Sequence, residues 1–356
     1  MTEQETINRL GWIDLPTKSR ALLPELDALS AWTRSNGLTE IVLCGMGGSS
    51  LAPEVIASTY KKSLTILDST DPVQVNNSVP SDLNKSVIVI SSKSGTTIET
   101  LSQYEFYVGK FKQANLNPTE HIVIVTDPGT PLDVIARNEG YKVVNADPNV
   151  GGRFSALSAF GLVPAALIGV DISLLLDDAE KLSPSLSLMD SPAIKIAASL
   201  FSLSDQVINF CDKNSTTPGL SNWIEQLIAE STGKNSNGRL PVVIEESTES
   251  FSGITVGFTP GSYDLTIEAT LGEQFLLWEW VTALLCFLLK VNPFNQPNVA
   301  EAKDRTSTIL SSLTNNGVNT PTPTYEDSDY LIFSSQKISN LSEFLKLKVS
   351  YFAILA

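Results

Sequence analysis

Residues 87–100, VIVISSKSGTTIET, place a cluster of hydroxyl side chains directly behind an apolar run. Five hydroxyl side chains and one lysine fall within the seven residues from Ser91 to Thr97. Two interpretations are open. A threonine such as Thr96 or Thr97 caps a helix, or the loop holds a phosphate through its hydroxyls and the amides of the helix that follows. The two roles are compatible, because one hydroxyl can begin the helix while the others face a ligand.

A glycine- and serine-rich loop, IVLCGMGGSSLAPEV, occupies residues 41–55 and has the same organisation. Its glycines Gly45, Gly47 and Gly48 allow a ligand to approach the backbone, and the helix that follows offers amide donors to an anion. A dinucleotide is the competing ligand, because Asp68 ends the next strand, where a ribose-binding acid belongs. A serine stands at the third position of the dinucleotide fingerprint, however, and this disfavours that ligand.

Two charged residues stand at the ends of expected helices. In NVGGRFSALSAFGLVPAAL (149–167), Arg153 follows two glycines at the start of an apolar helix. A cation there is unfavourable for the helix dipole, so it needs an anionic partner or ligand. In IEQLIAESTGKNSNGRLP (224–241), Glu230 ends a helical segment and could reach into a cleft. The ordinary alternatives are a surface ion pair and a solvated glutamate.

The segment NPFNQPNVAEAKDRT, residues 292–306, contains two prolines together with Gln296 and Lys303. A helix is expected to begin near Asn298, after the second proline. Lys303 could be an ordinary solvent-exposed lysine on that helix, so this segment does not decide a role by itself.

The first half of the chain alternates short apolar runs with segments of helical length. Each run is rich in Val and Ile and nearly continuously apolar, which is typical of strands buried on both faces of a parallel sheet. We therefore predict an α/β fold with a doubly wound parallel sheet flanked by helices. The two loops then face one crevice at the carboxyl ends of the strands. The predicted strands are residues 41–45, 64–68, 86–92, 121–127 and 141–147, and the helical segments between them include 51–62, 97–113 and 131–140.

The second half is more helical, and the segment KLSPSLSLMDSP (181–192) predicts a linker because it is rich in Ser and Pro. We accordingly expect two subdomains, residues 1–185 and 186–356. A polar surface loop is expected over residues 311–329. The predicted helices are residues 192–213, 221–230, 272–290, 299–313 and 338–347, and the predicted strands are 240–245, 264–269, 330–335 and 351–356.

Composition and charge limit the classes of function. The chain of 356 residues has a net charge of -15, which disfavours binding to a nucleic-acid backbone. Its three cysteines are widely spaced, which favours a reducing compartment. The polar N-terminus has no signal peptide, and the apolar runs 154–170 and 275–289 are shorter than the ~20 residues of a membrane span. We expect a cytoplasmic protein with neither a membrane nor a nucleic-acid partner.

Taken together, these segments resemble phosphoglucose isomerases, and most closely the isomerase half of the bacterial fused transaldolase/phosphoglucose isomerases. The similarity extends over nearly the whole chain in five ordered motifs. GMGGSSLAPEV resembles the family's glycine-serine loop, SKSGTTIET its phosphate loop and VGGRFSALSAFG its arginine signature. AESTGK resembles its glutamate signature, and NPFNQPNVAEAK its C-terminal signature. Phosphosugar loops also occur in non-catalytic regulators, but the last three motifs are specific to the isomerases.

The resemblance implies two subdomains of the sugar-isomerase (SIS) type and a reversible conversion of glucose 6-phosphate to fructose 6-phosphate, without a metal or a cofactor. It implies that Glu230 moves a proton between C2 and C1 of the sugar. Arg153 would stabilise the enediolate, because a fixed cation lowers the barrier to forming charge on oxygen. Gln296 and Lys303 would contact the sugar end of the site. Carried over by position, the 6-phosphate would bind the backbone at Ser49 and Lys93 and the side chains of Ser92, Ser94 and Thr97.

The family's ring-opening histidine lies in an HSxGQ segment that a neighbouring subunit contributes. The resemblance thus implies a homodimer, and a transaldolase partner by analogy with the fused relatives. Residues 231–291 contain no histidine, and His121, the only one in the chain, is expected to be structural. In the fused relatives we expect such a segment beyond the position where this chain stops, Ala356. Either ring opening is impaired here, or this chain is one part of a longer protein.

Two further functions remain open. A phosphosugar-binding module without turnover would use the phosphate loop alone, as a sensor or as a folded partner. A nucleotide-dependent oxidoreductase would use the loop from Gly45 to Ser50. Binding of a phosphosugar without isomerisation, or binding of a nicotinamide dinucleotide, would identify these two cases.

Overall fold

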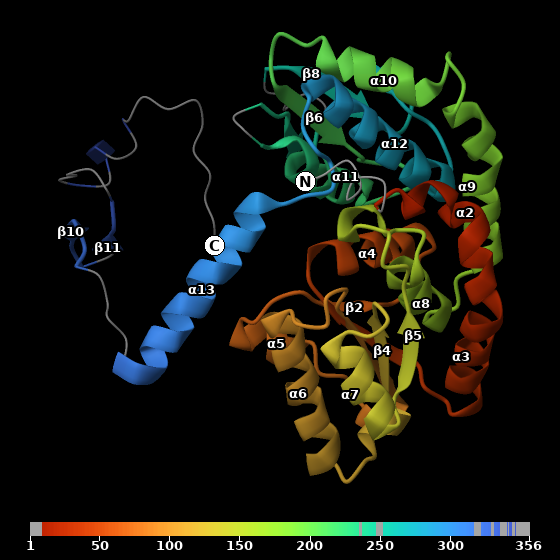
Figure 1. Cartoon of the computed structure of the whole chain (residues 1–356), viewed down its shortest axis with the longest axis vertical. Coiled ribbons are helices and arrows are strands. Elements are labelled where there is room, and N and C mark those ends of the chain that lie inside the picture. The colour runs from red at the N-terminus through yellow and green to blue at the C-terminus, as the bar shows by residue number, and fades with distance from the viewer. Residues whose placement is uncertain are drawn as a thin grey trace. The chain divides into compact units, whose positions relative to one another are not determined.

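The computed structural model in Figure 1 describes residues 9–234, 237–246, 252–316, 322–328, 331–334, 340, 342–343 and 346. The chain forms two compact units, residues 1–295 and residues 296–356. The first unit contains two parallel sheets, one on each side of residue 185 in the sequence. A boundary at residues 185 and 186 therefore remains a proposal about subdomains within this first unit.

The first sheet has five parallel strands in the spatial order β2-β1-β3-β4-β5. Every apolar run predicted as a strand in the first half of the chain forms one. This is a doubly wound order, and the chain reverses its direction of winding between β1 and β3. The strands are β1 (Glu40–Gly45), β2 (Thr65–Leu67), β3 (Ser86–Ser91), β4 (Ile122–Thr126) and β5 (Lys142–Asn145).

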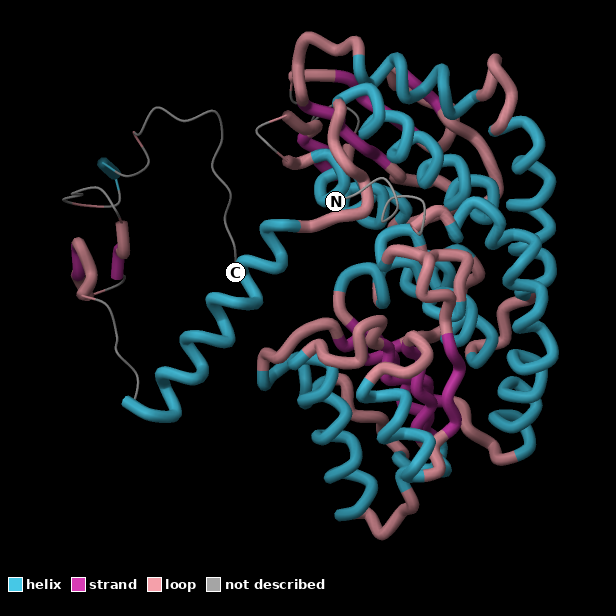
Figure 2. Tube along the Cα trace, viewed as in Figure 1, coloured by secondary structure: helices cyan, strands magenta, loops and turns pink. Residues whose placement is uncertain are grey.

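Alternating side chains of these strands point into two separate cores, because successive residues of a strand face opposite sides of the sheet. Leu43, Val89 and Val123 face one core, whereas Val42 and Ile88 face the other. Burial on both faces explains why the strands are apolar without alternation. Helices α3 (Leu23–Ser35), α4 (Leu51–Thr59) and α8 (Ala159–Leu167) cover the first face, and α6 (Ile98–Gln113) and α7 (Pro131–Glu139) cover the second (Figure 2).

The second sheet has four parallel strands in the order β7-β6-β8-β9. Its helices pack on one another and continue the core of the first sheet, so the two sheets share one large apolar cluster. The strands are β6 (Val207–Cys211), β7 (Leu240–Val243), β8 (Ile254–Gly257) and β9 (Leu265–Thr266), and the helices are α9 (Ile172–Leu186), α10 (Pro192–Phe201), α11 (Leu220–Thr232) and α12 (Leu271–Leu289).

The structure corrects two sequence predictions in this half. The helix predicted over 192–213 ends at Phe201, and the rest of that segment holds β6, whose β-branched and aromatic residues VINFC favour a strand. The linker predicted over 181–192 is helical as far as Leu186. Leu182 and Leu186 pack against the core, and this burial extends α9 by a turn. Strand β8 was not predicted at all.

Helix α12 is long and apolar enough to cross a membrane by length and composition. About two thirds of its apolar window, 67%, is buried inside the protein, where α12 packs against α9, α10 and α11. The residues that the structure describes hold no other helix of this kind. The apolar run is thus a core helix, as the sequence predicted.

The second unit contains α13 (Pro297–Asn316) and an antiparallel pair of strands, β10 (Tyr325–Glu326) and β11 (Leu331–Ile332). The helix and the strand predicted over 299–313 and 330–335 are confirmed. The loop predicted over 311–329 is wrong in part, because α13 continues through Asn316 and strand β10 also lies within this segment. The helix predicted over 338–347 lies largely, and the strand over 351–356 entirely, outside the described residues. The remaining short helices are η1 (Gly11–Asp14), α2 (Leu15–Lys18), η2 (Ser19–Leu22), η3 (Gly47–Ser49), α5 (Pro72–Asn77), η4 (Leu83–Lys85), η5 (Pro118–Glu120) and η6 (Gly152–Phe154).

Candidate active site

The glycine-serine loop and the phosphate loop meet at the carboxyl ends of β1 and β3. Gly45 and Ser91 are partners in the parallel register. A Cβ atom on Gly45 would lie 3.0 Å from the Cβ of Ser49 and 3.2 Å from the carbonyl oxygen of Ser91. Both loops therefore lie at the point where the winding of the sheet reverses, which is where open α/β sheets bind their ligands.

The phosphate loop, residues 92–97, is organised by its own hydroxyls. The Ser92 hydroxyl donates to Thr97 Oγ1 at 3.2 Å, and both the amide and the hydroxyl of Thr96 donate to Ser94 Oγ at 3.3 and 2.9 Å. Thr97 occupies the N-cap position of α6, but its side chain accepts no hydrogen bond from the helix. The amides of the first turn of α6 thus remain available to an anion, which favours the phosphate interpretation over simple capping.

The glycine-serine loop packs closely against two other segments. A Cβ atom on Gly47 would lie 2.5 Å from Nε2 of Gln226 on α11, and one on Gly48 would lie 2.5 Å from the carbonyl oxygen of Gly152. The backbone oxygen restricts Gly48 to glycine, and the φ of 56° at Gly47 lies in the left-handed region that favours glycine. The loop thus joins the phosphate loop to the segments that carry Arg153 and Glu230.

Arg153 and Glu230 form an ion pair beside these loops, with Arg153 Nε 3.2 Å from Glu230 Oε2. Gln226, one turn earlier on α11, donates to Glu230 Oε1 at 3.0 Å. The side chain of Arg153 is only 10% exposed, whereas that of Glu230 is 35% exposed. Burial lowers the pKa of Arg153, and the charge of Glu230 opposes this shift. Arg153 and Gln226 thus both contact the carboxylate of Glu230, whose side chain is still partly exposed.

Arg153 also holds the segment that precedes Gln296. Its Nη1 donates to Ser231 Oγ at 2.5 Å and to the carbonyl of Pro293 at 3.0 Å, and its Nη2 donates to the carbonyl of Asn295 at 3.2 Å. An arginine can serve several acceptors at once because its planar guanidinium has five donors. The residue was expected to need an anionic partner, and it has one in Glu230.

Similarity to known proteins agrees with this geometry. The family model described as phosphoglucose isomerase matches residues 23–237. The chain belongs to the phosphoglucose isomerase family. A probable glucose-6-phosphate isomerase of Haloarcula marismortui is 31% identical over 259 residues. That match covers 69% of this chain and 56% of the relative, so the chain spans little more than half of that relative's length.

Solved structures show the same fold. A hypothetical protein of Thermus thermophilus superposes with a TM-score of 0.75 and 25% identity, covering 85% of this chain and 91% of that one. A glucose-6-phosphate isomerase of Chlamydia trachomatis superposes with a TM-score of 0.70 and 18% identity, covering 83% and 74%. The two parallel sheets therefore form the sugar-isomerase type of fold.

Within this family, two residues of the site were missed by sequence reasoning. Gln226 was overlooked, although its spacing of four residues from Glu230 on a helix places both side chains on one face. Lys234 lies in the AESTGK motif but received no role. It is 6% exposed, and its Nζ donates to the carbonyl of Asn292 at 2.5 Å. Arg153 and Lys234 together hold the turn at residues 292–295.

Burial lowers the pKa of Lys234 from 10.5 to about 8, and the nearby charge of Arg153 adds to this shift. Between these two pH values the unfolded chain keeps a proton that the folded protein has lost, so stability rises with pH across this window. Lys234→Met removes this dependence. We expect the free energy of unfolding of the wild type, minus that of the variant, to increase by about 2 kcal/mol from pH 7 to pH 10. Urea denaturation of both proteins at four pH values measures this difference. If the free energy of unfolding depends on pH in the same way in both proteins, Lys234 does not have the lowered pKa.

The packing of Gly48 against Gly152 gives a second test. In Gly48→Ala, the new Cβ would lie 2.5 Å from a backbone oxygen, so the segment carrying Arg153 must shift. We expect kcat/KM to fall by about a hundredfold, because a shift of about 1 Å in a segment that carries a catalytic group can cost that much. Gly109→Ala in α6 is the control: its Cβ meets no atom within 4 Å, so activity should be unchanged and stability should rise by ~0.5 kcal/mol. Equal kinetics for both variants would disprove the effect.

The two remaining residues assigned by resemblance, Gln296 and Lys303, belong to the second unit. Lys303 lies on α13, and the family model ends before both residues. Their place in the site rests on resemblance alone. His121 lies at the amino end of β4, where it contacts the carbonyl of Ser86 at 3.0 Å and stacks on the ring of Phe111. It is thus part of the core at the edge opposite the two loops, as expected of a structural histidine.

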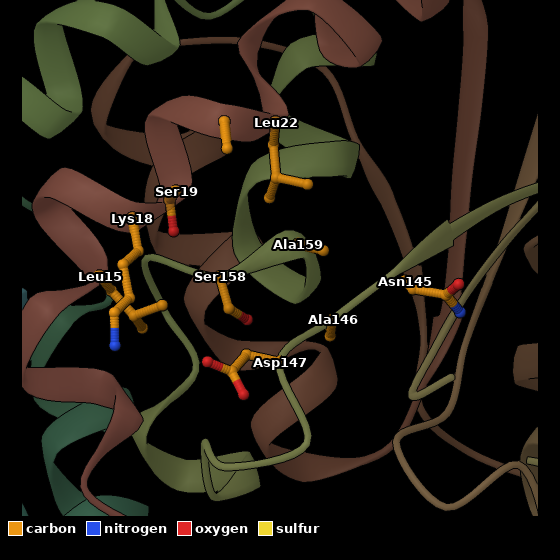
Figure 3. A pocket seen from close by; sticks show the side chains of 10 residues that line it. Leu15, Lys18, Ser19, Leu22, Asn145, Ala146, Asp147, Ser158 and Ala159 are labelled. Carbon is orange, nitrogen blue, oxygen red and sulfur yellow. The ribbon is translucent and has the colours of Figure 1, made fainter. Parts of the chain in front are cut away.

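A cavity of about 280 Å³ lies beside the carboxyl end of β5, lined partly by Lys18, Ser19, Asp147 and Ser158 (Figure 3). None of the predicted site residues lines it. Its two serines are already bonded within the protein, Ser19 to the carbonyl of Leu157 and Ser158 to that of Ser155. The cavity is thus separate from the site at β1 and β3.

Proposed function

We propose that this protein is an aldose-ketose isomerase that interconverts glucose 6-phosphate and fructose 6-phosphate through an enediolate. The observation that carries the proposal is the Arg153–Glu230 ion pair, which lies beside the glycine-serine loop at the edge where the phosphate loop also lies. Membership of the phosphoglucose isomerase family and glucose-6-phosphate isomerase relatives support the same reaction.

The phosphate loop anchors the end of the sugar that does not react. Its hydroxyls, from Ser92, Ser94 and Thr97, and the backbone at Ser49 and Lys93 bind the 6-phosphate. Hydroxyl and amide donors at a helix N-terminus suit an anion even in a protein with a net charge of -15. Binding of the phosphate thus positions C1 and C2 of the sugar relative to the protein.

Glu230 carries the proton. It takes the proton from C2 of the open-chain aldose, the electron pair forms the C1–C2 double bond, and negative charge develops on the carbonyl oxygen. Arg153 stabilises this charge, because a fixed cation in a water-poor site needs no reorganisation during the reaction. A proton then passes from the hydroxyl on C2 to the oxygen on C1, and Glu230 returns its proton to C1 as the C2 carbonyl forms, which gives the ketose. Gln226 orients the carboxylate, while Gln296 and Lys303 contact the sugar end, by resemblance to the family.

Isomerisation of fructose 6-phosphate in D2O tests the proposal. Transfer by a carboxylate base exchanges part of the proton with solvent, so NMR should detect deuterium at C2 of the glucose 6-phosphate formed. Binding of fructose 6-phosphate in calorimetry without turnover would instead identify a phosphosugar-binding module. A failure of fructose 6-phosphate to bind would reject both functions.

The setting of the enzyme belongs to the same proposal. We infer a cytoplasmic enzyme that acts in glycolysis and gluconeogenesis and forms a homodimer. Association with a transaldolase follows by analogy with the fused relatives. Sedimentation of the protein with and without a transaldolase tests both associations, and a monomer in both samples would reject them.

A further inference from the structure

Lys93, in the middle of the phosphate loop, is bound to the neighbouring loop after β4 rather than to its own. Its Nζ lies 2.6 Å from Asp127 Oδ2, and the two side chains are only 21% and 15% exposed. Its carbonyl accepts a hydrogen bond from the amide of Asp127 at 3.3 Å and one from Thr126 Oγ1 at 3.5 Å. Both the backbone and the side chain of Lys93 therefore join the two loops.

The loop after β4 also supports the phosphate loop at a second position. A Cβ atom on Gly95 would lie 2.7 Å from Thr130 Oγ1, and Thr130 in turn hydrogen-bonds Thr126 at 2.9 Å. Gly95 has a φ of 63°, in the left-handed region that favours glycine. Gly95 thus packs closely against Thr130 at a position separate from the Lys93–Asp127 ion pair.

The ion pair is buried enough to matter electrostatically. Burial lowers the pKa of Lys93 and raises the pKa of Asp127, and the contact between them opposes both shifts. Arg9 lowers the pKa of both groups and Asp147 raises the pKa of both, so these two further charges act in opposite directions. Asp127 Oδ1 is buried without a hydrogen-bond partner among the described residues, and Lys93 forms an ion pair with the other carboxylate oxygen, Oδ2.

We propose that Asp127 is a positioning residue that binds and neutralises Lys93, so that neutral hydroxyl and amide donors hold the substrate phosphate. This rests on the proposed function of the loop. An unpaired lysine would attract the phosphate of substrate and product equally. Such uniform binding lowers KM without accelerating the chemical step.

The sign of the effect on phosphate affinity tests this inference. Asp127→Asn leaves the charge of Lys93 uncompensated. The asparagine side chain still offers an oxygen to Lys93 Nζ, and the backbone N–H of residue 127 still donates to the Lys93 carbonyl. We expect the inhibition constant of inorganic phosphate and the KM for fructose 6-phosphate to fall about threefold to tenfold. Lys93→Gln leaves the carboxylate unpaired, so both constants should rise by a similar factor. The double variant should return to within about twofold of the wild type.

Ionic strength separates an electrostatic role from a structural one. The effects of both single variants should shrink as salt is raised from 0.05 M to 0.5 M, because the loop edge is within reach of solvent. Asp82→Asn, which removes one charge before the amino end of β3, is the matched control and should leave the phosphate constants unchanged.

Several results would overturn the inference. If both single variants weaken phosphate binding, the pair is only structural. If Asp127→Asn does not fold, Asp127→Ser takes its place. The inference then requires the phosphate constants to fall in Asp127→Ser and to rise in Lys93→Gln. If the wild type binds no inorganic phosphate in calorimetry, the phosphate loop is wrongly assigned and the proposed function fails with it. If the wild type binds phosphate but both single variants change the affinity in the same direction, only this inference is rejected.

Discussion

Glu230→Gln should lower kcat for fructose 6-phosphate by about a hundred- to ten-thousand-fold, the range that a positioned general base contributes. Glutamine has nearly the same shape and keeps one oxygen for Arg153, while the Gln226 amide can turn so that its oxygen accepts from the new N–H group. The fold and the binding of the phosphate should therefore survive. It cannot accept the proton. We therefore expect KM to change by less than about threefold while turnover is lost. Steady-state kinetics and deuterium exchange at C2 measure both effects.

Glu225→Gln is the matched control for this variant. Glu225 lies on the same helix, α11, and is half-buried, with a pKa that burial raises. If carboxylates of α11 mattered only for stability, the two variants would behave alike. Near-normal kcat in Glu230→Gln would show that another group is the base.

Arg153→Lys should have the second largest effect. Lysine keeps the positive charge but has one compact donor group, which cannot reach Glu230, Ser231 and two carbonyls of the 293–295 turn together. We expect kcat to fall by about a hundred- to a thousandfold, because the enediolate loses its fixed donors. Stability should also fall by about 2 kcal/mol, because buried acceptors lose their partners. Steady-state kinetics and urea denaturation measure the two changes.

Arg137→Lys provides the comparison for an ordinary arginine. Arg137 pairs with Asp133 on α7, and its side chain is 52% exposed. The Arg137 side chain is half exposed, and Asp133 keeps the donors of Gly129 and Asn145, so activity should be normal and stability should change by less than ~1 kcal/mol. If Arg153→Lys were equally mild, Arg153 would have no catalytic role.

The strands of the first sheet were predictable because strands buried on both faces of a sheet must be apolar at nearly every position. Ile88 and Val89 face different cores, and both are fully buried, so the run must be continuously apolar. The same argument failed for residues 192–213, where a buried helix and a buried strand follow one another. A short apolar run fits either element by periodicity, and only sheet pairing of Val207–Cys211 with β7 and β8 decides between them.

Part of the site was also predictable, for a local reason. Glycines and hydroxyls directly after a buried strand must lie at the carboxyl edge of the sheet, whatever the rest of the chain does. The partners of these loops were not predictable from local sequence. Asp127 looks like an ordinary residue after a strand, and Gln226 like an ordinary residue of a helix. Their contacts with Lys93 and Glu230 depend on which strands and helices become neighbours.

The sequence by itself thus determined which residues end the strands of the first sheet and which of them could hold a phosphate or move a proton. Those properties follow from residue type and from position relative to one strand or helix. Only the tertiary structure decided that Arg153 meets Glu230, because that contact requires α11 to pack against the glycine-serine loop. It also decided that the Lys93 side chain meets Asp127. The physical reason is that sheet order and helix packing bring distant segments together, and no local pattern of residues encodes such pairs.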